Sequence, residues 1–184
     1  MRVITGTARG RRLKELEWQE TRPTTDRVKE GLFSALQFDI EGRRVLDLFA
    51  GTGQLGIETL SRGAAHATFV DCRREAVALI RENLAVTDLS HRATVVSGDS
   101  LAFLSGVKEK YDLVFLDPPY AADLLEKALE MLARFDILSP HGIIVAESSA
   151  EKALPPLHPP YGIYRDYRYG KIKLTIYHRE GNED

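Results

Sequence analysis

The stretch Val45-Leu-Asp-Leu-Phe-Ala-Gly-Thr-Gly-Gln-Leu-Gly56 decides the fold of this 184-residue chain. A short apolar run leads into glycines at positions 51, 53 and 56, and a helical pattern of apolar residues follows them. Glycine lets the backbone turn sharply and lets the amide donors of a helix N-terminus approach a ligand closely. A strand, a glycine turn and a helix in this order are typical of a nucleotide-binding α/β fold.

Outward from this stretch, short apolar runs alternate with helical periods along most of the chain. Such alternation predicts βαβ units and a mostly parallel sheet covered on both faces. A predicted hairpin around Gly170 adds an antiparallel pair, so we expect a Rossmann-like α/β fold with a central seven-stranded sheet. The predicted strands are 45–49, 67–70, 93–96, 113–116, 143–146, 161–169 and 171–178, and the predicted helices between them are 55–61, 75–86, 101–104 and 124–133.

The first residues form a predicted extension before this sheet. Residues 1–16 are expected to make two short strands joined by a turn, and Thr24, Thr25 or Asp26 can cap a helix that runs to about Phe38. We predict a single domain over 1–184, with 1–22 as a basic N-terminal β-hairpin extension. Both ends of the chain are basic, which indicates an anionic partner, although charge alone favours ordinary solvated surface.

Composition and charge exclude several classes of protein. The 43% hydrophobic and 28% charged residues suit a globular domain, and not a disordered, collagen-like or coiled-coil chain. The net charge of −2 argues against a globally basic nucleic-acid-binding protein. Cys72 is the single cysteine and cannot form an internal disulfide, which favours a cytoplasmic location. The histidines have no metal-binding spacing, and no apolar run is long enough to cross a membrane.

Three acids lie in or shortly after the first three predicted strands. Asp71 ends the strand after the glycine turn, where a carboxylate can accept both ribose hydroxyls of a nucleoside. Asp47 lies inside an apolar strand, where burying a carboxylate is costly unless it meets a donor or a cation. It would repel a pyrophosphate and attract an ammonium group, which favours S-adenosylmethionine over NAD. Asp99 follows the third strand and can accept from an adenine amino group, cap a helix, or do both.

A second motif, Asp117-Pro-Pro-Tyr120, comes directly after the apolar strand 113–116. Because ligands of open α/β sheets bind at the carboxyl ends of the strands, the motif should face the same crevice as the glycine turn. Proline has no N–H, so the Asp117 carboxylate and the Pro118 carbonyl are acceptors that can orient an exocyclic amine. Pro119 stiffens the turn, and Tyr120 can stack on a base. The alternative is a helix-capping turn with Tyr120 in the core.

These motifs in this order resemble a class I S-adenosylmethionine-dependent methyltransferase that acts on an exocyclic amine. Three further stretches narrow the resemblance to the bacterial 16S rRNA guanine-N2 methyltransferases of the RsmD family, which modify guanine 966. They are the opening Arg2-Val-Ile-Thr-Gly-Thr with Gly10-Arg-Arg-Leu, the stretch Arg22-Pro-Thr-Thr-Asp-Arg-Val-Lys-Glu30, and the closing Tyr169-Gly-Lys171. The match covers nearly the whole chain, and Gln54 in the loop departs from the family pattern.

The resemblance implies roles for the residues at matching positions. It implies a flipped guanine held by the second motif, no metal, a monomer, and 16S rRNA in an assembled or assembling small ribosomal subunit as the substrate. The implied catalytic residues are Asp117, Pro118, Pro119 and Tyr120. The implied S-adenosylmethionine-binding residues are Thr25, Arg27, Asp47, Phe49, Ala50, Gly51, Thr52, Gly53, Asp71, Cys72, Asp99 and Ser100. The implied RNA-binding residues are Arg9, Arg11, Arg12, Lys14 and Arg22.

Four alternative functions stay open at this point. A DNA adenine-N6 methyltransferase shares the second motif but generally needs a target-recognition region, for which the gap from Asp99 to Asp117 is too short. A protein-glutamine methyltransferase usually has asparagine in place of Asp117. An NAD-dependent dehydrogenase would have to explain Asp47. A non-catalytic RNA-binding protein could keep the fold without turnover.

Three smaller questions also stay open. Cys72 either contacts the adenine ring or fills the core. The tyrosines at 161, 164, 167 and 169 lie among arginines, and we expect them to pack against the hairpin rather than to stack on bases. Glu147 ends a buried strand on the crevice side and contacts either the substrate or a neighbouring strand end.

Overall fold

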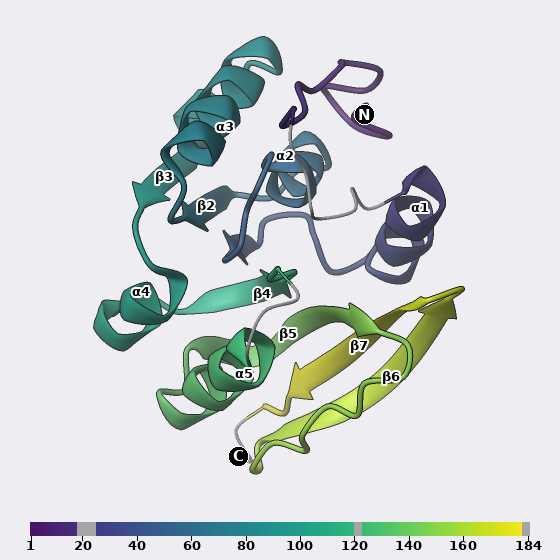
Figure 1. The fold of residues 1–184 in the computed structure, drawn as a ribbon, viewed down its shortest axis with the longest axis vertical. Helices are drawn as coiled ribbons and strands as arrows, with labels where there is room; N and C mark the ends of the chain where they lie inside the picture. The colour runs from purple at the N-terminus through teal and green to yellow at the C-terminus, as the bar shows by residue number, and fades with distance from the viewer. Residues whose placement is uncertain (18–24, 120–122, 182–184) are drawn as a thin grey trace.

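The computed structural model describes residues 1–17, 25–119 and 123–181 (Figure 1). Its seven strands form one sheet in the order β3-β2-β1-β4-β5-β7-β6, with the first five in parallel and the last two antiparallel to their neighbours. This confirms the predicted sheet and its C-terminal hairpin. The strands are β1 (Arg44–Asp47), β2 (His66–Asp71), β3 (Ala93–Ser97), β4 (Tyr111–Leu116), β5 (Leu138–Ser149), β6 (Tyr161–Tyr169) and β7 (Ile172–Arg179).

Helices cover both faces of the sheet, as Figure 1 shows. On one face lie α1 (Asp26–Ala35), α2 (Gln54–Ser61) and α3 (Arg74–Val86), and on the other lie α4 (Ser100–Gly106) and α5 (Leu124–Arg134). A short 3-10 helix, Ser90–Arg92, precedes β3. Each face has its own apolar core. Among the described residues, no helix is both long and apolar enough to cross a membrane.

The alternation of side chains along the strands assigns the polar residues to one face. In β1, Val45 packs in the core beneath α1, α2 and α3, and Leu46 packs in the opposite core. Asp47 therefore points to the same side as Val45, toward α2. The same alternation in β4 sends Phe115 to the first core and Leu116 to the second, so Asp117 returns to the side of Asp47.

Most predicted elements match the structure within a few residues, and the largest difference is at β5. The apolar run predicts 143–146, whereas the strand begins at Leu138 and continues to Ser149. The polar segment 139–141 hides its first half from an apolar pattern. At α1 the cap is Thr25, whose Oγ1 accepts from the Val28 amide at 3.3 Å, and the helix ends at Ala35 rather than near Phe38.

The N-terminal extension is a hairpin with a single β-bridge, between Arg2 and Arg12, and not two regular strands. The amides of Val3, Gly10 and Leu13 donate to carbonyls across the hairpin, and other amides of the extension bond to α2. The Ile4 and Thr5 amides donate to the Glu58 carboxylate, and the Ala8 amide donates to Ser61 Oγ at 3.0 Å. The hairpin is thus fastened to the sheet domain along its length. Its apolar side chains Val3, Ala8 and Leu13 are buried in the first core.

The tyrosines of the C-terminal hairpin pack as expected, with one exception. The Tyr161 hydroxyl is held at 2.6 Å from Asp136 Oδ1, and the pKa of Tyr161 is raised by burial and by that carboxylate. Tyr167 and Tyr169 pack against the first core. Tyr164 is 61% exposed and stacks on His178 with a centroid distance of 4.1 Å. It alone of the four presents most of its ring to solvent.

Candidate active site

Five acids lie at the carboxyl ends of the five parallel strands. In sheet order they are Asp99 after β3, Asp71 at the end of β2, Asp47 at the end of β1, Asp117 after β4, and Glu147 near the end of β5. We call them the acid row. Such an edge repels phosphate and attracts cations and amines. No group of His, Cys, Asp and Glu side chains in the described part of the chain is arranged to hold a metal ion.

The glycine loop between β1 and α2 leaves its backbone open beside this row. Gly51 and Gly53 have φ of +59° and +81°, a backbone region that residues other than glycine rarely adopt. A Cβ at Gly51 would meet only Arg73 Nη2, at 4.0 Å, so the loop offers room there for a ligand. Gly56 has another role, since a Cβ there would come within 2.3 Å of the Phe69 ring. It permits the close packing of α2 on β2.

Asp47 is a buried acid with too few partners. It is 3% exposed and accepts one hydrogen bond from the Gly56 amide, at 3.1 Å. Burial raises its pKa to about 7, and the charge of Asp71 adds to the rise, while the Gly56 bond opposes it. Within the described residues Asp47 has no ion pair. Its position suits a ligand that brings a positive charge.

Asp71 holds the glycine loop in place. Its Oδ2 accepts from the Gly51 amide at 2.9 Å, and its Oδ1 accepts from the Arg73 amide at 2.9 Å. Arg73 also forms an ion pair with it at 3.3 Å. The next residue, Cys72, is exposed, so of its two alternatives the structure excludes the core filler. The chain leaves the sheet at this point.

Asp99 and Ser100 lie at the start of α4. Asp99 Oδ2 accepts from the Ala102 amide at 2.8 Å, which confirms the predicted helix cap. Ser100 is buried. The second carboxylate oxygen of Asp99 is not used by the cap, so the cap leaves one acceptor for another donor.

Asp117 and Glu147 form a pair of hydrogen-bonded carboxyl groups. Burial raises the pKa of Asp117 well above its ordinary value, and the charges of Glu147 and Asp47 raise it further. Two carboxyl groups share a hydrogen bond only when one of them carries a proton, so the pair holds a shared proton in the free protein. The sequence left two possible contacts for Glu147, the substrate and a neighbouring strand end. The structure shows the contact with the neighbouring strand end. Pro118 is half-buried and Pro119 exposed. Tyr120 lies outside the described residues.

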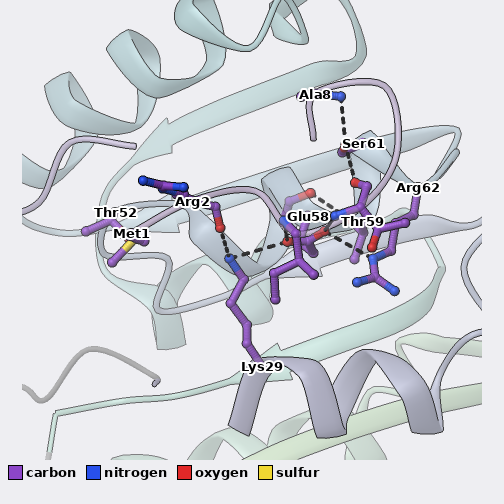
Figure 2. A network of polar contacts seen from close by, with 12 residues as sticks. Met1, Arg2, Ala8, Lys29, Thr52, Glu58, Thr59, Ser61 and Arg62 are labelled. Atoms are coloured by element: carbon purple, nitrogen blue, oxygen red, sulfur yellow. Dashed lines mark hydrogen bonds and ion pairs between the residues drawn. The ribbon is translucent and has the colours of Figure 1, made fainter. Parts of the chain in front are cut away.

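A buried ion-pair network fastens the extension and α1 to α2 (Figure 2). Glu58 and Lys29 are both fully buried, and their charged atoms lie 3.4 Å apart. Lys29 also donates to the Arg2 carbonyl at 3.0 Å, and Arg62 Nε donates to Glu58 at 3.1 Å. Sequence reasoning missed this network. Its signal is a charge at a helix position that the apolar pattern places inside, since Lys29 follows Val28 on the buried face of α1.

Asn83 of α3 joins the extension to the glycine loop. Its Oδ1 accepts from the Lys14 amide at 2.8 Å, and its Nδ2 donates to the carbonyls of Lys14 and Thr52, at 3.1 and 2.9 Å. Thr52 Oγ1 also lies 3.6 Å from Met1 Sδ, and Figure 2 shows the two side chains together. The basic extension is therefore in direct contact with the loop that would hold a cofactor.

The predicted RNA-binding and helix-start residues are all at the surface where the structure describes them. Arg9 and Arg12 are exposed, Arg11 donates to the Val86 carbonyl at 3.4 Å, and Lys14 forms an exposed ion pair with Glu82 at 2.9 Å. Arg22 lies outside the described residues. Thr25 and Arg27 are exposed at the first turn of α1, and Phe49 and Ala50 lie in the loop after β1.

Known proteins share this sequence and fold over nearly the whole chain. The family model described as conserved hypothetical protein 95 matches residues 1–178. The chain is 36% identical to ribosomal RNA small subunit methyltransferase D of Escherichia coli, over 98% of this chain and 90% of that one. It is 39% identical to the protein of the same name in Haemophilus influenzae, over 84% and 81%. The solved structure of the Escherichia coli protein yhhF superposes with a TM-score of 0.89 at 35% identity, over 99% of both chains.

The fold, the glycine loop and the acid row define a class I methyltransferase, which sets aside the dehydrogenase alternative. The chain belongs to the conserved hypothetical protein 95 family, the family of ribosomal RNA small subunit methyltransferase D.

Proposed function

We propose that the protein transfers the methyl group of S-adenosylmethionine to the exocyclic N2 amine of a guanine in 16S ribosomal RNA. The observation that carries this proposal is the placement of Asp47 and Asp117 on one side of the adjacent strands β1 and β4. An acid suited to an ammonium group thereby lies beside an acid suited to an amine. The names of the Escherichia coli and Haemophilus influenzae relatives support ribosomal RNA as the substrate.

The residues at the sheet edge fit S-adenosylmethionine. When bound, this cofactor supplies an electrophilic methyl carbon attached to a positively charged sulfur. Asp47 would hold the ammonium group, Asp71 the ribose hydroxyls, and Asp99 with Ser100 the adenine. The open backbone at Gly51 leaves room for the methionine moiety among residues 49–53. Thr25 and Arg27, at the exposed start of α1, would close over the methionine carboxylate, and Cys72 would lie beside the adenine.

The chemistry asked of the protein is to prepare a poor nucleophile. The N2 lone pair of guanine is delocalised into the ring. The Asp117 carboxyl group and the Pro118 carbonyl each accept a hydrogen bond from N2–H, which turns the lone pair away from the ring plane. Pro119 keeps this turn stiff, and Tyr120 stacks on the base. Asp117, once ionised by the nearby cofactor charge, takes the proton that the methylated amine releases. Positioning and electrostatics supply most of the rate gain.

The RNA would be held through its phosphates by the extension. Arg9, Arg11, Arg12, Lys14 and Arg22 supply positive charge there, a contribution that does not depend on base sequence. Extruding the guanine costs a few kcal/mol, and less from a loop. We place the monomeric protein in the cytoplasm, acting on an assembled or assembling small ribosomal subunit.

The test is transfer of labelled methyl from S-adenosylmethionine to three acceptors. They are small subunits from cells that lack the modification, naked 16S rRNA and duplex DNA. We expect N2-methylguanine in the ribosomal RNA, and a loss of at least about 100-fold in Asp117→Ala. Asp112→Ala is the matched control, because Asp112 lies at the other end of β4 and accepts from the Arg44 amide. Methyladenine in the DNA would overturn the proposed substrate and keep the class.

A further inference from the structure

The pairing of β4 with β5 sets a second acceptor beside Asp117. Leu116 pairs with Ala146 in register, so the residues that follow, Asp117 and Glu147, occupy the next position along the two strands. Neighbouring strands lie about 4.8 Å apart. Both side chains point to the face that carries Asp47, and the two carboxyl groups are hydrogen-bonded. On the other side of Glu147 its partner in β7 is the buried Leu174, so the register gives it an acid on one side and an apolar residue on the other.

The base edge that faces such a pair differs between guanine and adenine. Guanine has two adjacent donors on its Watson–Crick edge, N1–H and N2–H. Adenine also has an exocyclic amine on this edge, but its neighbouring N1 is an acceptor without a hydrogen. A carboxylate next to the amine acceptor therefore gains a hydrogen bond with guanine and opposes a lone pair with adenine.

We propose that Glu147 determines specificity for guanine by accepting a hydrogen bond from N1–H while Asp117 accepts from N2–H. The inference rests on the proposed function and adds to it the reason why the methylated base is guanine. The register places the two carboxyl groups side by side, so each can accept from one of the two adjacent donors of guanine, and an ionised carboxylate is a stronger acceptor than a neutral group. Asp47 is the remaining acid that faces the pair, and its charge raises the pKa of Asp117.

The arrangement also separates guanine from adenine methyltransfer in physical terms. The acceptors of the second motif serve any exocyclic amine, because they contact only its N–H groups. Glu147 of β5 instead contacts the neighbouring ring nitrogen, N1, which carries a hydrogen in guanine and none in adenine. An unmatched polar group at such a site should give a preference of about 10- to 100-fold, which corresponds to about 1.4–2.8 kcal/mol.

The test replaces the target guanine by 2-aminopurine, which keeps the 2-amino group but has no hydrogen on N1. Small-subunit particles are reconstituted with 16S rRNA that carries either base at the position methylated by the wild type. We expect the wild type to methylate guanine about 10- to 100-fold faster than 2-aminopurine. In Glu147→Gln the side-chain amide can donate to N1, so the ratio should fall to about threefold or less, or reverse. Glu151→Gln, an exposed change on the same segment, should keep the wild-type ratio.

Four outcomes decide the inference. A wild-type enzyme that methylates both bases equally overturns it, and so does a Glu147→Gln enzyme that keeps the wild-type ratio. An equal loss on both bases, with unchanged affinity for S-adenosylmethionine, shows a general requirement and also overturns it. Glu147→Ala provides a second variant if Glu147→Gln does not fold, and it should lower the ratio as well. A wild type that leaves guanine unmethylated removes the proposed function itself, which the wild-type arm alone reveals.

Discussion

Glu58 in α2 and Asp47 in β1 are both buried acids on the side of the sheet that α2 covers. They differ in the number of partners that the protein gives them. Glu58 lies within reach of two cations, Lys29 and Arg62, and accepts from two backbone amides of the extension. Asp47 accepts from one amide, and its neighbours in the acid row are other acids. A buried acid with a full set of partners holds elements together. A buried acid with one partner is costly in the free protein and suits a ligand that brings the missing charge.

The largest effect should come from breaking the well-partnered acid. Lys29→Met leaves Glu58 buried without its closest ammonium group, so we expect a loss of about 3–5 kcal/mol in the free energy of unfolding. Urea unfolding followed by circular dichroism measures it. Lys127→Met removes an exposed lysine from α5 and should change stability by less than about 0.5 kcal/mol. A loss below about 1 kcal/mol in Lys29→Met would show that Glu58 does not depend on this ion pair.

The role of Asp47 should appear in the pH dependence of S-adenosylmethionine binding rather than in the stability of the protein. Its pKa in the free protein is raised to about 7 by burial, and a bound ammonium group requires the ionised form. The affinity for S-adenosylmethionine should therefore be constant above pH 7 and weaken below it, approaching tenfold per pH unit. Binding at pH 6.5 should release protons, seen by calorimetry in buffers of different ionisation enthalpy.

The matched variants sharpen this prediction. Asp47→Asn should weaken binding at pH 8 by about 10- to 100-fold, because a charged hydrogen bond is lost, and should abolish the pH dependence below 7. Asp112→Asn, on the neighbouring strand and outside the row, should keep both the affinity and the slope. A slope that persists in Asp47→Asn would assign the titration to another member of the acid row.

The sequence predicts the acid row better than it predicts the network around Glu58. Asp47, Asp71, Asp99 and Asp117 each follow an apolar strand, and the carboxyl ends of parallel strands meet at one edge of a sheet. Local patterns therefore place them together. The contact of Glu147 with Asp117 depends instead on the register between β4 and β5, and the polar first half of β5 hides that register.

The contacts of the extension are harder still to predict. Lys29 and Glu58 lie on different helices, and Asn83 reaches both Lys14 and Thr52 from a third. Nothing local in the sequence indicates which side chains will satisfy the amides of Ile4, Thr5 and Ala8. Each buried apolar residue of the extension, Val3, Ala8 and Leu13, has an exposed arginine next to it in the sequence.

The smallest effects should come from the arginines of the extension. Like the two acids, Arg11 and Arg12 differ in whether they already have a partner in the protein. Arg11 already donates to the Val86 carbonyl, whereas Arg12 is exposed beside it. Each phosphate contact contributes about 0.7 to 0.9 to the slope of log affinity against log salt. We expect Arg12→Glu to weaken RNA binding several-fold and to lower this slope by about one contact, and Arg11→Glu to do less.

Filter binding at several salt concentrations measures both, with Arg134→Glu on α5 as the control on the opposite face of the sheet. If reversing both arginines together left affinity and slope unchanged, the RNA would have to be held elsewhere, and the exposed Tyr164 of β6 would be the next surface to test.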